Sequence, residues 1–223
     1  MIKVVFCLPG KSYSNNFLES WTKLLLHCLS FNFQIAMKWA YTSNVYQVRN
    51  LCLMGKPTLG IDQKPFGGNL DYDYIMWIDS DSVFTPEQFA SLFAQMEQNK
   101  DLHILSGLYF REGKKNFATV LNLKSKYFEK HGEAKFLTPK NIKGLKGLLR
   151  VDYTGMGFMM IKYGVFEKLD YPWFQPMGIQ GTKGLVGFTS EDAAFCIRAR
   201  EKGFETFVDP QIIIGHEKSI ILK

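Results

Sequence analysis

The chain has 223 residues, of which 46% are hydrophobic and 15% aromatic, which is enough to build one well-buried domain. Its N-terminal apolar run is too short for a signal peptide, and no segment has the length of a transmembrane helix. The four cysteines have no C-x-x-C spacing, which favours reduced core thiols over a disulfide framework or a zinc site. These features predict a soluble, cytoplasmic protein.

Positive charge is concentrated in one segment. The net charge is +6, but residues 111–150 contain eleven Lys or Arg and three Glu, a surplus of eight, so the rest of the chain carries about two net negative charges. The favoured interpretation is a solvated, Lys-rich insertion. The alternative is a contact surface for an anionic partner such as membrane lipid, which would make the protein peripheral to a membrane. No nucleic-acid-binding motif accompanies the segment, so no nucleic acid partner is expected.

Strands and helices alternate in the first half of the chain. Short β-branched and aromatic runs predict strands at 2–8, 34–41, 74–78 and 102–109. Apolar residues at helical spacing predict helices between them, with caps at Asn16, at Ser43 or Asn44, and at Thr85. This order predicts an α/β fold with a parallel sheet and helices on both faces.

The second half is more mixed. After the basic segment, the sequence predicts a strand at 151–161, a short helix around 165–169, a Gly-rich loop at 175–188, a helix from about 190 to 202 and a last strand ending at IIIGHE. Thr189 is the predicted cap of the 190–202 helix.

Asp79 and Asp81 follow the apolar run 74–78, at the predicted carboxyl end of a strand, where ligands bind in open α/β sheets. Residues i and i+2 of extended backbone project to the same side, so the two carboxylates are expected close together. A Mg²⁺ or Mn²⁺ ion relieves their repulsion and keeps positions open for phosphate oxygens. The alternative is that Asp79 caps a turn while Asp81 is solvated.

WIDSDSV at 77–83 also fits the D-x-D-x-T/V motif of the haloacid dehalogenase phosphatases, with Asp79 as the nucleophile. In that family the aspartate usually opens the domain, whereas here two strand–helix units precede it. The late G-D-x-x-x-D motif of that family is missing from this chain. A phosphohydrolase is therefore the second interpretation.

Three further segments are informative: NVYQVRN at 44–50, VDYTGMGFMMIKYGVFEKL at 151–169, and SEDAAFCIRAREKGFETFVDPQIIIGHEKS at 190–219. Together with WIDSDS, they resemble GT-A fold glycosyltransferases, especially the inverting, family-two-like ones, over most of the chain. The resemblance implies that Asp79 and Asp81 hold a nucleotide-sugar and its metal, that Asp192 in SED is the catalytic base, and that His216 in GHE is a further metal ligand.

Glu191 and Asp192 also have an ordinary interpretation as first-turn acids, which the helix dipole favours. The same dipole would keep Asp192 ionised, as a base requires. We include Glu191 with Asp192 as the catalytic candidates.

Four other residues have two interpretations each. Gly155 and Gly157 either allow tight packing or let the backbone approach the sugar. Arg49 is either a helix-surface cation or reaches the diphosphate or Asp79. Trp173 is either a core residue or stacks on an acceptor sugar.

The sequence therefore predicts a single GT-A domain over 1–223, with a mostly parallel, Rossmann-like sheet. Residues 1–110 form its nucleotide-binding half, with Pro9 at the nucleotide site, and 111–223 form its acceptor-binding half. The predicted reaction uses Mn²⁺ or Mg²⁺ and moves a sugar from a nucleotide-sugar donor, expected to carry UDP, to a hydroxyl of a sugar or glycan acceptor. Inversion is implied by the resemblance alone. The alternatives are the phosphohydrolase, a non-catalytic nucleotide-sugar-binding protein, and a nucleic-acid-binding module built on 111–150.

Overall fold

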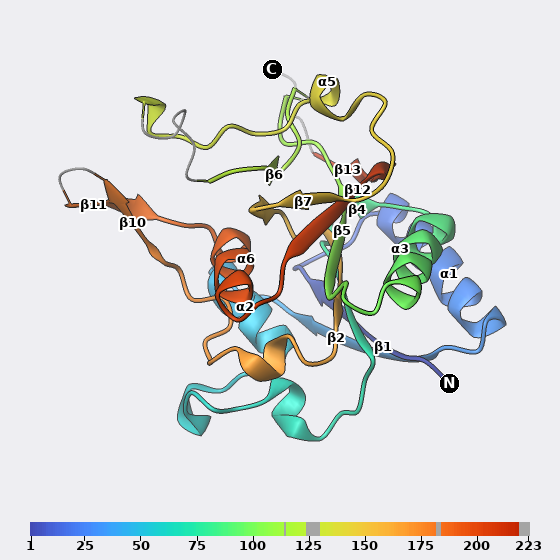
Figure 1. The fold of residues 1–223 in the computed structure, drawn as a ribbon. Helices are drawn as coiled ribbons and strands as arrows, with labels where there is room; N and C mark the ends of the chain where they lie inside the picture. The colour runs from blue at the N-terminus through green and yellow to red at the C-terminus, as the bar shows by residue number, and fades with distance from the viewer. Residues whose placement is uncertain (114, 124–129, 182–183, 219–223) are drawn as a thin grey trace, which may run out of the picture.

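The computed structural model describes residues 1–113, 115–123, 130–181 and 184–218, and within these ranges a seven-stranded sheet forms the centre of the fold (Figure 1). The strand order is β2 (Gln34–Ala40), β1 (Lys3–Pro9), β3 (Tyr74–Ile78), β9 (Phe158–Lys162), β5 (Ile104–Leu108), β12 (Thr206–Ile213) and β7 (Leu149–Val151). β9 and β7 run antiparallel to their neighbours, while the other five strands share one direction. The predicted mostly parallel α/β architecture of GT-A type is confirmed.

Helices cover both faces of this sheet (Figure 1). Along β1, Val4 and Phe6 pack in the core cluster that includes α1 and α3, whereas Val5 and Cys7 pack in the cluster that includes α2 and α6. This alternation follows from the two-residue period of a strand. The helices are α1 (Asn15–Ser30), α2 (Val45–Cys52), α3 (Pro86–Gln98), α5 (Pro139–Ile142) and α6 (Glu191–Glu201), with 3₁₀ turns η1 (Pro57–Leu59), η2 (Pro65–Gly68) and η3 (Phe166–Lys168).

Two helices begin where the sequence predicts. Thr85 and Gln88 form a capping box at the start of α3, each side chain bonding the other residue's backbone N–H. Asn44 caps α2 by accepting a hydrogen bond from the backbone N–H of Tyr46. This cap fixes the start of the helix that carries Arg49.

Two predicted caps are wrong by one or two residues. Ser14, and not Asn16, caps α1, because the Ser14 hydroxyl accepts the Phe17 N–H at 3.1 Å. The N-cap of α6 is Ser190 and not Thr189, so Asp192 is the second residue of the helix.

The second half departs further from the prediction. The expected strand at 151–161 is interrupted at Asp152 and again at Gly155–Gly157, so its residues belong to β7, β8 (Tyr153–Thr154) and β9. β8 pairs with β6 (Thr119–Val120) instead of joining the main sheet. The expected loop at 175–188 contains a hairpin, β10 (Gly178–Gly181) and β11 (Gly184–Phe188). A last small pair, β4 (Ser82–Val83) with β13 (Gly215–His216), places Gly215 and His216 beside the segment that follows β3.

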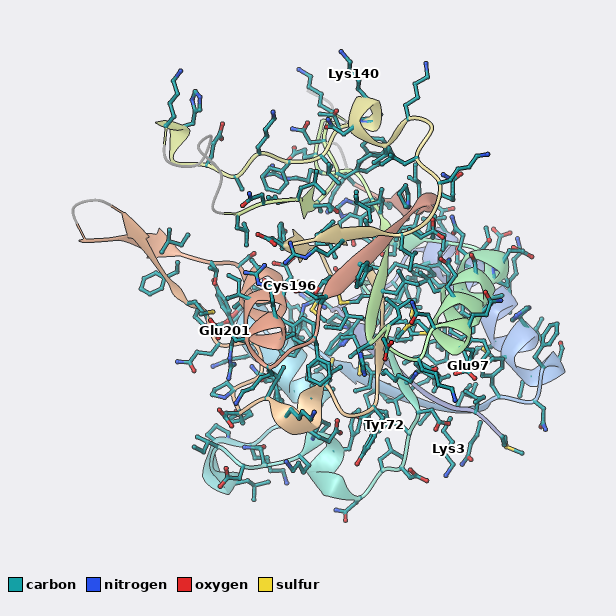
Figure 2. All side chains as sticks on the ribbon, viewed as in Figure 1. Lys3, Tyr72, Glu97, Lys140, Cys196 and Glu201 are labelled. Carbon is teal, nitrogen blue, oxygen red and sulfur yellow. The ribbon has the colours of Figure 1, made fainter. Side chains whose placement is uncertain are left out.

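The basic segment lies above one end of the sheet and includes β6 and α5 (Figure 1). A small core of its own attaches it, formed by Leu108, Phe117, Leu137, Ile142, Val151 and Val208. Lys140 on α5 projects outward from this layer (Figure 2). Contact of this layer with an anionic membrane stays a prediction.

All four cysteines of the chain are buried and unpaired, as expected for core thiols, and Cys196 lies between α6 and the sheet (Figure 2). Within the described part of the chain, none of the helices combines the length and the hydrophobicity that crossing a bilayer requires.

Candidate functional site

A cavity of about 400 Å³ opens at the carboxyl ends of β1 and β3. Its lining includes six of the residues that the sequence singled out: Pro9, Arg49, Asp79, Asp81, Glu191 and Asp192. Ligands of open α/β sheets bind at this end of the strands. The structure thus brings most of the predicted site residues into one cavity.

A glycine lets two backbone segments meet at this cavity. A Cβ atom added to Gly10 would lie 2.4 Å from the Cβ of Ser80, closer than real Cβ atoms approach. The end of β1 can therefore reach the loop that carries Asp79 and Asp81 only because residue 10 has no side chain.

Arg49 joins three elements at the centre of the site. Its Nη2 lies 3.1 Å from the Asp79 carboxylate, which follows β3, and its Nε lies 3.1 Å from the Glu191 carboxylate, at the start of α6. The Arg49 side chain is only 4% exposed, and its guanidinium lies over the ring of Trp77. Of its two interpretations, the surface cation is excluded and the contact with Asp79 is present.

The Arg49 guanidinium also acts on the pKa of Asp79. Burial raises the pKa of Asp79, while the neighbouring Arg49 guanidinium opposes that shift. Arg49 Nη1 is also buried, and it has no hydrogen-bond partner among the described residues.

Asp81 has different partners from Asp79. The pairing of β4 with β13 places His216 Nε2 3.1 Å from Asp81 Oδ2, and Lys218 Nζ lies 2.7 Å from the same oxygen. His216 Nδ1 lies 2.7 Å from the carbonyl oxygen of Phe110. Because a carbonyl can only accept, Nδ1 carries a proton and Nε2 is the nitrogen presented to Asp81.

The backbone at this point is not extended as predicted. A turn follows β3, with Ser82 N–H bonded to the Asp79 carbonyl at 3.0 Å. Both carboxylates still line the cavity. Burial raises the pKa of Asp81, but the hydrogen bonds from His216 and Lys218 outweigh it and lower the value to about 2.

Asp192 is held at both of its oxygens. Oδ1 accepts the Ala193 N–H at 2.8 Å, and Oδ2 accepts the Tyr153 hydroxyl at 3.3 Å. Asp192 is 8% exposed. Burial, with the adjacent Glu191 charge, raises its pKa to about 6. The predicted lowering by the helix dipole is therefore outweighed, although the carboxylate is still mostly ionised at neutral pH.

The predicted stacking of Trp173 on an acceptor sugar is wrong. Trp173 has no exposed surface and packs against Phe166 and Tyr171 in the core, so it cannot stack on an acceptor sugar. Gly155 and Gly157 face a side chain: added Cβ atoms would lie 1.9 Å and 2.9 Å from atoms of Tyr109. Their tight-packing interpretation is the one that the structure supports.

Three further residues of the site were not expected from the sequence: Tyr109, Tyr153 and Lys218. Tyr109 lines the cavity directly after β5, so the rule that picked out Asp79 at a strand end would also have found it. Tyr153 lies within the segment that resembles glycosyltransferases. Lys218 carries no signal of its own, because its contact with Asp81 spans 137 positions.

Comparison with known families gives one match. Residues 69–164, somewhat less than half of the chain, match the model of glycosyl transferase family 2. This range holds β3, Asp79, Asp81 and β9 but ends before the 190–219 segment. A search of curated proteins finds no significant match.

A solved structure shares the fold at low sequence identity. The chain resembles A197 from STIV with a TM-score of 0.55 and 14% identity, over 100% of this chain and 97% of that one. Drosophila β1,4-galactosyltransferase 7 has a TM-score of 0.46 and 13% identity, over 98% of this chain and 72% of that one. S. aureus TarS has a TM-score of 0.47 and 11% identity, over 96% of this chain and 60% of that one. The last two are too distant to support an inference. The family match and the A197 likeness support a GT-A, family-2-like fold.

Replacing Arg49 by Ala should strongly destabilise the protein, because it leaves the buried Glu191 carboxylate and the partly buried Asp79 carboxylate without a cation. We expect a loss of about 3–5 kcal/mol in the free energy of unfolding, measured by urea denaturation. Lys23→Ala is the matched control, since it removes the cation of an exposed ion pair with Glu19, and should cost less than about 0.5 kcal/mol. Equal losses in the two variants would contradict the assignment.

Proposed function

We propose that the protein is a metal-dependent glycosyltransferase that moves a sugar from a nucleotide-sugar donor, with UDP as the nucleotide, to a hydroxyl of a sugar or glycan acceptor. One observation carries the proposal. Asp79 and Asp81 share a cavity with Asp192, within a chain whose residues 69–164 match glycosyl transferase family 2. The two groups of carboxylates suit the two tasks of the reaction, which are holding a donor diphosphate and accepting a proton.

Asp81 and His216 fit a divalent cation. A carboxylate oxygen and an imidazole nitrogen face each other at 3.1 Å, and a hydrogen bond to Phe110 fixes the ring. Among the described residues, no three His, Cys, Asp or Glu side chains are grouped to hold an ion by themselves. This suits Mn²⁺ or Mg²⁺, which bind through one or two protein ligands plus substrate phosphates. When bound, the cation would supply positive charge opposite the departing diphosphate.

Arg49 and Asp79 are assigned to binding of the nucleotide-sugar donor. In this proposal, Asp79 accepts a hydrogen bond from the ribose or from a water on the metal. Arg49 lines the cavity, and a guanidinium forms strong hydrogen bonds to anionic oxygens such as those of a diphosphate. Glu191 keeps the guanidinium in place through its ion pair and is not the base.

Asp192 accepts the proton of the attacking hydroxyl. The acceptor oxygen then bonds to the anomeric carbon, and the bond from that carbon to the diphosphate oxygen breaks, with its electron pair leaving on the diphosphate. Direct in-line attack inverts the anomeric centre. A carboxylate with a pKa of about 6 is ionised at neutral pH and is a stronger base than an exposed aspartate. Residues 1–110 bind the nucleotide, and 111–223 supply the base and the acceptor site.

Replacing Asp81 by Asn should abolish Mn²⁺-dependent binding of UDP, because the variant loses the negative charge of the proposed metal site. Calorimetry with UDP in the presence and absence of Mn²⁺ measures this. Asp62→Asn, a change at an exposed residue outside the cavity, should bind as the wild type does. Unchanged affinity in Asp81→Asn would mean that the cation binds elsewhere.

Replacing Asp192 by Asn should lower kcat by roughly 10²- to 10⁴-fold, the usual contribution of a general base, with UDP-sugar affinity nearly intact. In the wild type, kcat/KM should rise with pH through about 6, because the pKa of Asp192 is raised and only its ionised form accepts a proton. A radiolabelled sugar-transfer assay measures both effects.

Glu201→Gln is the control for Asp192→Asn, because Glu201 is an exposed acid on the same helix. Glu191→Gln is unsuitable, since it breaks the buried pair with Arg49. Full transfer activity in Asp192→Asn would refute the assignment of the base. If phosphate release from a simple phosphomonoester depends on Asp79 instead, the phosphohydrolase interpretation holds.

A further inference from the structure

Tyr109 occupies a position in the cavity to which the proposed chemistry assigns no task. It follows β5 directly and lines the same cavity as Asp79, Asp81 and Asp192. Burial raises the pKa of its phenol, the charges of Asp79 and Asp192 act in the same direction, and a hydrogen bond with the Gly157 backbone opposes them. Tyr109 is therefore near the proposed donor site and near the proposed base at once.

The ring of Tyr109 has little freedom to move. On one side lie Gly155 and Gly157, where an added Cβ would come within 1.9 Å of the Tyr109 hydroxyl oxygen and within 2.9 Å of its ring, respectively. On another side the ring of His216 packs edge-on, with 5.1 Å between ring centroids. Its backbone carbonyl is held by the Ala118 N–H at 3.0 Å. The phenol is thus fixed by packing before any ligand arrives.

This packing gives the Gly-Met-Gly sequence a physical role. Side chains at 155 and 157 would occupy the space that the Tyr109 ring fills. The glycine pair, on the connection between β8 and β9, is what allows a large side chain from β5 to reach the cavity. A prepositioned hydroxyl loses little conformational entropy on binding a ligand.

We propose that the Tyr109 hydroxyl hydrogen-bonds the transferred sugar and helps to select it, an inference that rests on the proposed function. In that function the sugar lies between the diphosphate, near Asp81, and the attacking hydroxyl, near Asp192. Tyr109 lines the cavity near both ends of this path, so its hydroxyl is placed to contact the sugar. The phenol oxygen already has the Gly157 backbone as a hydrogen-bond partner, but the phenol can still donate its own proton to a sugar hydroxyl. A site built to bond a hydroxyl discriminates against sugars that lack it in that position.

Tyr109→Phe tests this directly, because it keeps the ring between the glycine pair and His216 and removes only the hydroxyl. Calorimetry with Mn²⁺ compares UDP with UDP-glucose, UDP-galactose and UDP-N-acetylglucosamine in both proteins. The variant should bind UDP as tightly as the wild type does. For the UDP-sugar that the wild type binds most tightly, its Kd should rise about three- to tenfold, the worth of one hydrogen bond.

Tyr163→Phe is the matched control, because Tyr163 is exposed and does not line this cavity, and all its Kd values should equal those of the wild type. An unchanged Kd for the UDP-sugar in Tyr109→Phe, or an equal loss for UDP, overturns the inference while leaving the proposed function intact. A wild type that binds neither UDP nor any of these UDP-sugars overturns both.

Discussion

The arrangement of the cavity depends on the buried guanidinium of Arg49. It lies between carboxylates from β3 and from the start of α6, at 3.1 Å from each. Without a cation, these two elements would bring like charges together in a poorly solvated place. A buried ion pair is weak evidence for stability, because desolvation offsets much of the attraction. It is better explained as a specific junction that fixes α2, β3 and α6 relative to one another. In the proposed reaction, that junction sets the distance between donor and base.

Close backbone approach is the second constraint, and glycines make it possible. Gly10 lets the end of β1 reach Ser80, while Gly155 and Gly157 admit the Tyr109 ring. Each of these contacts lies beside a charged group of the cavity. The layer formed by 111–150 is tied to the same region, because β6 pairs with β8 and Tyr153 of β8 bonds Asp192.

The features that depend on residues close together in the sequence were predicted best. The strand 74–78 and the Thr85 capping box are confirmed because burial on both faces and capping depend on neighbouring residues. The antiparallel insertion of β9 and the contact of Lys218 with Asp81 were missed because they depend on distant pairing. The stacking of Trp173 on an acceptor sugar was wrongly expected, because a sequence does not distinguish a buried aromatic residue beside a proline from an exposed one. The gathering of Asp79, Asp81 and Asp192 was predicted from the resemblance and not from spacing, whereas the contact of Arg49 with Asp79 was one of two interpretations left open.

Diffraction from a crystal grown with UDP and Mn²⁺ tests the central claim most directly, because manganese is located by its anomalous signal. If Asp81 and His216 hold the cation, one manganese peak is expected in the cavity, coordinated by the Asp81 carboxylate, by His216 Nε2 and by diphosphate oxygens. Lys218 is then displaced from Asp81. Asp192 is further expected to lie on the other side of the diphosphate from the uracil. A manganese peak away from Asp81 and His216, or UDP bound outside this cavity, would contradict the central claim.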